Sequence, residues 1–131
     1  MHSTAYCRNL SFVVGQPASF EERDDHPSAL EYLMGALAGD LATGFATACS
    51  QVGLQVDDVE ITVRAKLHNV LAHLGLEEGD PSLESVSLKA FASTLEDETR
   101  VRTVWDEVLR RSPLFTTLAK ATRLETKLTT I

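Results

Sequence analysis

Cysteine and clustered positive charge are scarce in this sequence, and each shortage excludes a class of protein. The two cysteines, Cys7 and Cys49, form no C-x-x-C pair and no other metal-binding spacing. We therefore expect two reduced thiols in a cytoplasmic protein, with no metal or other cofactor. The chain has 12 Lys and Arg residues against 19 Asp and Glu, a net charge of −7, and only Arg110 and Arg111 are adjacent. Because phosphate binding needs clustered basic residues, we predict no nucleic-acid partner.

The sequence also lacks a visible leader and an uninterrupted hydrophobic run. Residues 1–10 contain no apolar segment followed by a small-residue cleavage site, so we expect no signal peptide. Residues 33–52 are about as long as a membrane span, but polar side chains interrupt them. These side chains belong to Asp40, Thr43, Thr47, Ser50 and Gln51. A buried helix of a soluble protein is therefore predicted, with no membrane partner.

What is present is the composition of an ordinary globular protein. With 131 residues, 44% hydrophobic and 24% charged, the chain suits a single domain over residues 1–131. Periodicity and turn residues predict an α+β fold in the order ββ-α-ββ-α-β, with antiparallel strands and one dominant helix. The expected strands are 7–14, a short extended piece at 18–20 after a break at 15–17, 56–67, 83–93 and 123–130. The expected helices are 28–52, 95–111 and 113–120, with a helical turn at 70–74.

The dominant helix has clear local end signals. Ser28 and Glu31 form an S-x-x-E capping box at its start, and Gly53 is placed to end it in a left-handed conformation. The helix is apolar on all sides, which predicts burial on all sides. Each glycine inside a helix costs about 1 kcal/mol relative to alanine. The glycines at 35, 39 and 44 therefore predict close packing against a sheet or a second copy of the helix.

Shorter sequence patterns predict which faces of the remaining strands and helices are buried. Aliphatic residues alternate with polar ones from Val59 to Leu67 and from Val86 to Ala92, which predicts two half-buried strands. Thr94 is expected to cap the helix at 95–111. The apolar stripe of that helix is Val101, Val104, Trp105, Val108 and Leu109.

Asp40 is the strongest candidate for a functional residue. It is the only acidic or basic side chain between Tyr32 and Gln51, in the middle of a helix with a core-like composition. A buried lone carboxylate must be paired, protonated or turned toward a cavity, and such carboxylates favour functional sites. The alternatives are a structural ion pair or a helix face that reaches solvent. Arg23 and Arg8 are the expected partners for an ion pair.

Other residues with reactive side chains have simpler interpretations. Ser112 followed by Pro113 is an ideal helix start, and no G-x-S-x-G motif supports a nucleophilic serine. The histidines at 26, 68 and 73 lack metal-ligand spacing. Cys49 lies roughly 180° around the helix from Asp40, so a buried inert thiol is predicted there.

The region from Pro27 to the C-terminus resembles the OsmC/Ohr family of osmotically inducible and organic hydroperoxide resistance proteins. The stretch from His26 to Asp40 is similar to the opening of the family's central helix, where a Pro and a Glu-Leu-Leu stretch precede Ala-Leu-Gly-Gly-Cys. Farther on, Arg111-Ser112-Pro113-Leu114 resembles the family's Cys-Pro-Val, before a short helix and a last strand.

This resemblance implies an intertwined homodimer, in which two long central helices pack together inside wrapped sheets. It also implies a site at the dimer interface where a reactive thiolate and a resolving thiol reduce organic hydroperoxides, with an Arg and a Glu nearby. The positions of the two family cysteines correspond to Asp40 and Ser112. The family's Glu falls near Leu30, one position before Glu31.

Three hypotheses follow. In the first, thiol peroxidase activity is lost, because neither Asp40 nor Ser112 can do cysteine chemistry, and an interfacial cleft binds a small molecule. Candidate binding residues are Asp40, Ser112, Arg23 and Glu31. In the second, the protein keeps a role in hydroperoxide resistance, or is an enzyme with Asp40 as general base. In the third, Asp40 is only a structural partner of Arg23.

Overall fold

A long helix, a three-stranded sheet and a separate β-hairpin make up most of the fold. The computed structural model describes residues 2–17 and 24–131. Its strands are β1 (Ser3–Cys7), β2 (Leu10–Val14), β3 (Asp58–Leu67), β4 (Leu83–Ser93) and β5 (Arg123–Thr130). Its helices are α1 (Ala29–Gln51), α2 (Val70–His73), α3 (Glu98–Arg111) and α4 (Pro113–Ala121). The predicted α+β class is confirmed.

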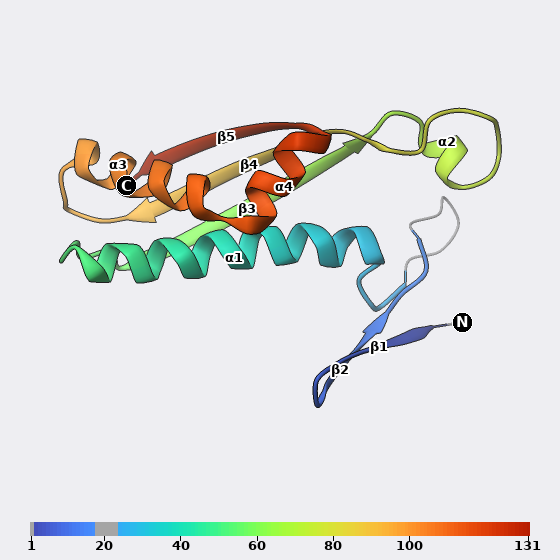
Figure 1. Cartoon of the computed structure of the whole chain (residues 1–131), viewed down its shortest axis with the longest axis horizontal. Helices are drawn as coiled ribbons and strands as arrows, with labels where there is room; N and C mark the ends of the chain where they lie inside the picture. Colours follow the sequence, from blue (N-terminus) through green and yellow to red (C-terminus); the bar gives the residue numbers. More distant parts are fainter. Residues whose placement is uncertain (1, 18–23) are drawn as a thin grey trace.

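The larger sheet has the strand order β3-β4-β5. The β3–β4 pair is antiparallel, as expected, whereas β5 pairs with β4 in parallel. This second pairing differs from the expected antiparallel arrangement. The reason is that α3 and α4 carry the chain back along the sheet, so that β5 starts at the same end as β4 (Figure 1).

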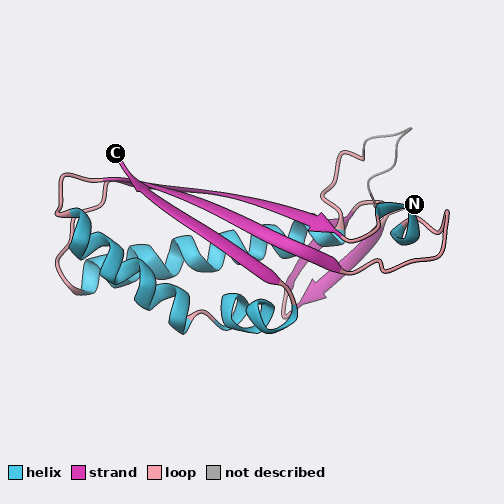
Figure 2. Cartoon of the chain, turned by 90° about the horizontal axis from the view of Figure 1, so that it is seen from above, coloured by secondary structure: helices cyan, strands magenta, loops and turns pink. Residues whose placement is uncertain are grey.

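The helices cover one face of this sheet. Figure 1 shows α1 running along the sheet with α3 and α4 beside it, and Figure 2 shows the three strands crossing α1 diagonally. The alternation predicted for β4 is confirmed, since Val86, Leu88, Ala90 and Ala92 are all buried, and in β3 Val59, Ile61 and Val63 are partly buried between exposed neighbours. Phe45 of α1 meets Trp105 of α3 edge to face, with ring centroids 5.5 Å apart. The core is therefore shared by α1, β4 and α3.

The end signals of α1 are confirmed. The amide of Glu31 donates to Ser28 Oγ at 3.3 Å, and the amide of Ser28 donates to Glu31 Oε1 at 3.0 Å. At the other end Gly53 adopts a φ of 72°. No helix within the described ranges is long and apolar enough to cross a membrane.

The expected burial of α1 on all sides does not occur within one chain. The helix buries one stripe and leaves the opposite face exposed. The stripe consists of Met34, Leu37, Leu41, Phe45 and Cys49. A Cβ atom at Gly44 would lie 3.3 Å from Val108 Cγ1, but at Gly35 and Gly39 it would meet no heavy atom within 4 Å. The close packing expected at three glycines is thus found at Gly44 alone.

Two other elements differ from their expected ranges. The stretch 7–14 is a hairpin turn followed by β2, with Arg8 at a φ of 56° and Cys7 paired with Leu10. Helix α3 begins at Glu98, because Thr94 Oγ1 accepts the amide of Glu96 at 3.0 Å and closes a turn ahead of the helix. The predicted extended piece at 18–20 and residues 21–23 lie outside the described residues.

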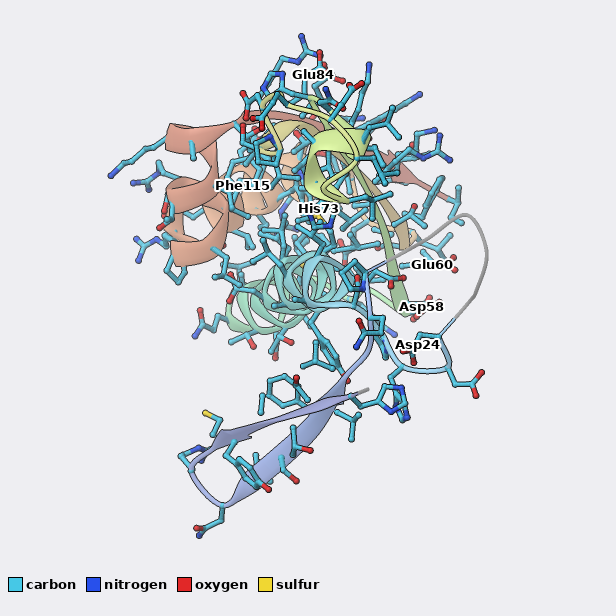
Figure 3. All side chains as sticks on the ribbon, turned by 90° about the vertical axis from the view of Figure 1, so that its right-hand side faces the viewer. Asp24, Asp58, Glu60, His73, Glu84 and Phe115 are labelled. Atoms are coloured by element: carbon cyan, nitrogen blue, oxygen red, sulfur yellow. The ribbon has the colours of Figure 1, made fainter. Side chains whose placement is uncertain are left out.

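The hairpin stands apart from the larger sheet. Figures 1 and 3 show it beyond the start of α1, on the side of the helix away from the sheet. Tyr32 of α1 holds it there by donating its hydroxyl to the carbonyl of Val13 at 2.8 Å. The hairpin exposes Tyr6, Leu10 and Phe12.

Candidate functional site

Asp40 lies on the flank of α1 between its buried stripe and its exposed face, and it is half-buried. Ser112 Oγ donates a hydrogen bond to Asp40 Oδ2 at 2.5 Å. None of the ion pairs found in the described part of the chain includes Asp40. The partner of Asp40 among the described residues is therefore the Ser112 hydroxyl. Arg8 lies in the hairpin turn, and Arg23 lies outside the described residues.

Ser112 serves two elements at once. Its Oγ accepts the amide of Phe115 at 3.0 Å, with Pro113 in the first turn of α4, so the predicted helix cap is confirmed. The hydroxyl of Ser112 also donates a hydrogen bond to Asp40, and this bond links the start of α4 to the middle of α1. Ser112 is 5% exposed.

These two residues lie at one end of a cleft of about 770 Å³ between α1 and α3. Helix α1 contributes Asp40, Thr43, Gly44, Thr47, Ala48 and Gln51. The other side consists of Thr103, Val104, Glu107, Val108 and Arg111, with Ser112, Pro113 and Val52 at the ends. The α3 side of the cleft therefore combines two valines with Thr103, Glu107 and Arg111, and the α1 side carries a row of polar side chains.

The other charges of the cleft are already paired. Arg111 Nε donates to Glu107 Oε1, and Arg110 donates to Glu107 Oε2 at 2.5 Å. These hydrogen bonds from Arg110 and Arg111 lower the pKa of Glu107. Because Arg111 is engaged with Glu107, Asp40 is the charge of the cleft that lacks an opposite charge among the described residues.

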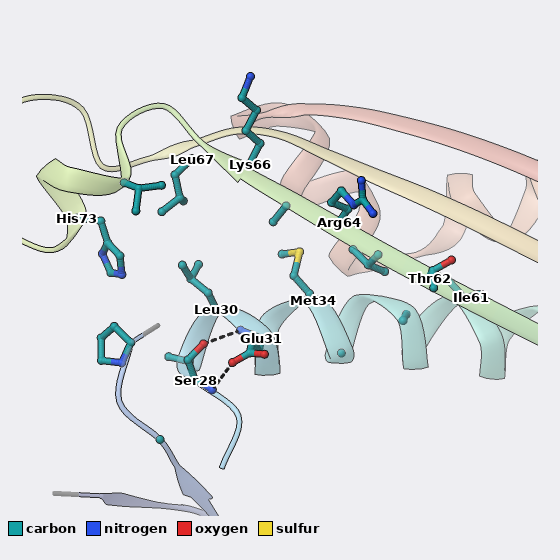
Figure 4. A pocket seen from close by; sticks show the side chains of 18 residues that line it. Ser28, Leu30, Glu31, Met34, Ile61, Thr62, Arg64, Lys66, Leu67 and His73 are labelled. Atoms are coloured by element: carbon teal, nitrogen blue, oxygen red, sulfur yellow. Dashed lines mark hydrogen bonds between the residues drawn. The ribbon is translucent and has the colours of Figure 1, made fainter. Parts of the chain in front are cut away.

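A larger cavity, of about 1010 Å³, lies on the other flank of α1 against β3 and α2. Figure 4 shows Glu31 and Ser28 in mutual contact at its edge, His73 facing it from α2, and Lys66 pointing away from α1. The carboxylate of Glu31 is engaged in the capping box. Since Glu31 lies nine residues before Asp40, roughly 13 Å along the axis, the structure does not bring these two candidates together.

The histidines and cysteines lie outside the Asp40 cleft. Among residues 2–17 and 24–131, no three His, Cys, Asp or Glu side chains are grouped to hold a metal ion. The backbone amide of His26 donates to Asp24, and His68 Nε2 lies 3.9 Å from Asp80 Oδ2. Cys49 is buried, and this burial raises the pKa of its thiol.

Sequence reasoning did not single out several residues of the cleft. Thr43 and Thr47 follow Asp40 at helical spacing, so their shared flank could have been predicted. Glu107 and Arg111 gave no such signal, because their approach to Asp40 depends on how α3 packs against α1.

The family model described as OsmC-like protein matches residues 22–127. The chain belongs to the OsmC-like protein family. No curated protein matches it in sequence at a significant level. The matched range includes the residues that line the Asp40 cleft and those of α4.

Solved structures share the fold of this OsmC-like chain. An OsmC-like protein from Mycoplasma pneumoniae is similar with a TM-score of 0.82 and 15% identity, over 99% of this chain and 89% of that one. An organic hydroperoxide resistance protein OsmC from Legionella pneumophila has a TM-score of 0.71 and 12% identity, over 98% of this chain and 95% of that one. The organic hydroperoxide resistance protein OhrB of Bacillus subtilis has a TM-score of 0.65 and 9% identity, over 98% of this chain and 96% of that one.

Proposed function

We propose that this OsmC-like protein has lost thiol peroxidase activity and binds a small molecule in the cleft beside Asp40. The observation that carries the proposal is the 2.5 Å hydrogen bond from Ser112 Oγ to Asp40 Oδ2 at the end of that cleft. The resemblance assigns the family's two cysteines to these two positions. A carboxylate and a hydroxyl can form neither a sulfenic acid nor a disulfide.

Neither cysteine of the chain is placed to replace the missing pair. Cys49 is 2% exposed and on the buried stripe of α1, away from Asp40. Because thiolates are the reactive form, a buried thiol with a raised pKa is a poor nucleophile. Cys7 is exposed at the end of β1 in the hairpin.

Peroxidase loss is tested directly with cumene hydroperoxide and t-butyl hydroperoxide in the presence of a dithiol reductant. We expect consumption no faster than with the double variant C7S/C49S, which controls for the two thiols. Consumption above that background by the parent chain would overturn the proposed loss. It would favour instead the hydroperoxide resistance named for the relatives from Legionella pneumophila and Bacillus subtilis.

We also propose that the chain forms an intertwined homodimer in the cytoplasm. The exposed Gly35 and Gly39 face of α1, the unpaired edge of β3 in the described sheet and the apolar side chains of the hairpin support a second copy. The two free cysteines favour a reducing compartment.

Sedimentation equilibrium tests the dimer. The variant G39L puts a bulky side chain on the open face of α1, where nothing in the same chain obstructs it. We expect the parent to sediment as a dimer and G39L to dissociate at concentrations where the matched surface variant T99L on α3 does not. A parent chain that sediments as a monomer would contradict the proposal.

A further inference from the structure

The ligand class of the Asp40 cleft follows from the charge that it lacks. Arg111 of the cleft is bonded to Glu107, and Ser112 donates to Asp40 but carries no charge. Of the two carboxylates that line the cleft, Glu107 is paired with Arg110 and Arg111, whereas Asp40 has no ion pair among the described residues of the chain. A half-buried carboxylate is most stable with an opposite charge nearby. A bound cation would supply it.

The hydrogen-bonding state of Asp40 narrows the kind of cation. Its Oδ2 already accepts from Ser112, whereas Oδ1 has no partner among the described residues. A guanidinium binds best through two parallel hydrogen bonds to both carboxylate oxygens. An ammonium group is a compact charge with three N–H donors, and it needs only one of the two carboxylate oxygens. Because Ser112 already occupies part of Oδ2, Oδ1 is the more open of the two oxygens, which suits an ammonium group better than a guanidinium.

The neighbouring side chains supply further acceptors. Thr43 and Thr47 follow Asp40 on the same flank of α1 and line the same cleft. Neither hydroxyl makes a hydrogen bond within the part of the chain that the structure describes. Hydroxyl oxygens accept from ammonium donors, and Thr43, about 4.5 Å along the helix axis from Asp40, is the nearer of the two.

The opposite wall determines what the rest of the ligand can be. Val104 and Val108 of α3 face this polar row, and Val108 Cγ1 approaches the backbone of Gly44 so closely that a Cβ there would lie 3.3 Å away. The α3 side of the cleft thus has an apolar part at these two valines, beside Thr103, Glu107 and Arg111. A short aliphatic chain attached to the ammonium would lie against these valines.

We infer that the cleft between α1 and α3 binds a primary alkylammonium compound, with its charged group at Asp40 and its aliphatic part against Val104 and Val108. This inference depends on the proposed function, because it names the ligand class of the same cleft. In this inference the carboxylate of Asp40 recognises the positive charge of the ligand.

The test is an NMR titration of the full chain with n-butylammonium, n-butanol and n-butyrate, which share a chain length and differ in charge. The backbone amide signals of Thr43, Gly44 and Ser112 report on the cleft. We expect n-butylammonium to shift them with an affinity about tenfold or more above that of n-butanol, as for a hydrogen bond to a charged group. We expect no binding of n-butyrate.

Variants separate the carboxylate from the overall charge of the protein. D40N keeps the shape of the side chain and removes its charge, and we expect it to lose the preference for n-butylammonium. The matched control is D106N, which removes the same charge from an exposed position of α3 that does not line the cleft. It should leave the affinity unchanged.

The outcomes distinguish the inference from the function on which it depends. If n-butanol or n-butyrate shifts the cleft signals as strongly as n-butylammonium does, the cleft binds small molecules but the ammonium class is wrong. If none of the three compounds shifts them, both the inference and the proposed binding function fail. Equal loss of affinity in D40N and D106N would also overturn the inference, because it would show a general charge effect.

Discussion

At the scale of single residues, Ser112 contributes more to the structure than its size suggests. Its Oγ accepts from the Phe115 amide and donates to Asp40, so one atom caps α4 and joins α4 to α1. Asp40 makes only the second of these contacts. The two side chains therefore differ in what their removal costs, although they share one hydrogen bond.

We predict that S112A lowers the free energy of unfolding by about 1–3 kcal/mol, from a lost helix cap and a lost bond to a charged acceptor. D40L should change it by less than about 1 kcal/mol, because the new apolar side chain offsets the lost bond. Urea unfolding of both variants measures the difference. A larger loss in D40L than in S112A would show that Asp40 is held for stability, not for binding.

The two cysteines should differ sharply in reactivity. Cys7 is exposed, whereas burial of Cys49 raises the pKa of its thiol. Iodoacetamide at neutral pH should label the folded parent chain once, at Cys7, and should leave C7S unlabelled until denaturant is added. Mass spectrometry of the tryptic peptides checks this. Rapid labelling of Cys49 in the folded protein would contradict the view that this thiol is inert.

At the scale of elements, the connection before α1 depends on Asp24. Its carboxylate accepts the amides of Gln16 and His26, each at 2.9 Å, and contacts His2 Nε2 at 3.0 Å. The two backbone amides, and to a lesser degree His2, lower the pKa of Asp24 from 3.8 to about 2. Asp24 thus joins the strand segment, the loop and the start of α1.

This lowered pKa predicts an acid-dependent loss of stability. Because the folded pKa lies below the unfolded one, the contribution of Asp24 is present above 3.8 and disappears as the pH falls through about 2. Thermal unfolding followed from about pH 5 to about pH 2 should show a steeper loss in the parent than in D24N. The neighbouring variant D25N should behave like the parent. Equal slopes in all three proteins would exclude this role.

Elements with local signals were predictable, and elements set by long-range packing were not. The capping box of α1 and the Ser112 cap each depend on residues within one turn, so sequence reasoning identified both. The hairpin was missed because its turn contains Arg8 at a positive φ, without the glycine that marks such turns. The parallel β5 was missed because its direction depends on the path of α3 and α4 across the sheet.

The same division applies to the candidate site. The isolated charge of Asp40 is visible in the sequence, and the family resemblance pairs its position with that of Ser112. Their direct contact joins residues separated by 72 positions, and only the folded chain shows it. Arg23 and Arg8 were plausible partners because nothing local indicates which side of α1 faces α3.

At the scale of the whole molecule, the fold retains the frame of its family, and we propose that Asp40 and Ser112 occupy the positions of the family's two cysteines. The family model spans residues 22–127, and the similarity to the Mycoplasma pneumoniae structure covers 99% of the chain. Side chains at positions 40 and 112 already meet at 2.5 Å. If the surrounding frame is intact, replacing only these two side chains should be enough to bring two sulfur atoms together.

The double variant D40C/S112C tests this. We expect it to form an intramolecular disulfide under mild oxidation and to lose both introduced thiols in a thiol count, because the side chains at these positions are already in contact. With a dithiol reductant it should consume t-butyl hydroperoxide faster than the parent chain does. D40C alone is the control, since it has a thiol to attack the peroxide but no partner at position 112. A double variant that forms the disulfide yet consumes no peroxide would show that the cleft has changed beyond these two positions. Failure to form the disulfide would contradict the expectation that the surrounding frame brings two sulfur atoms together.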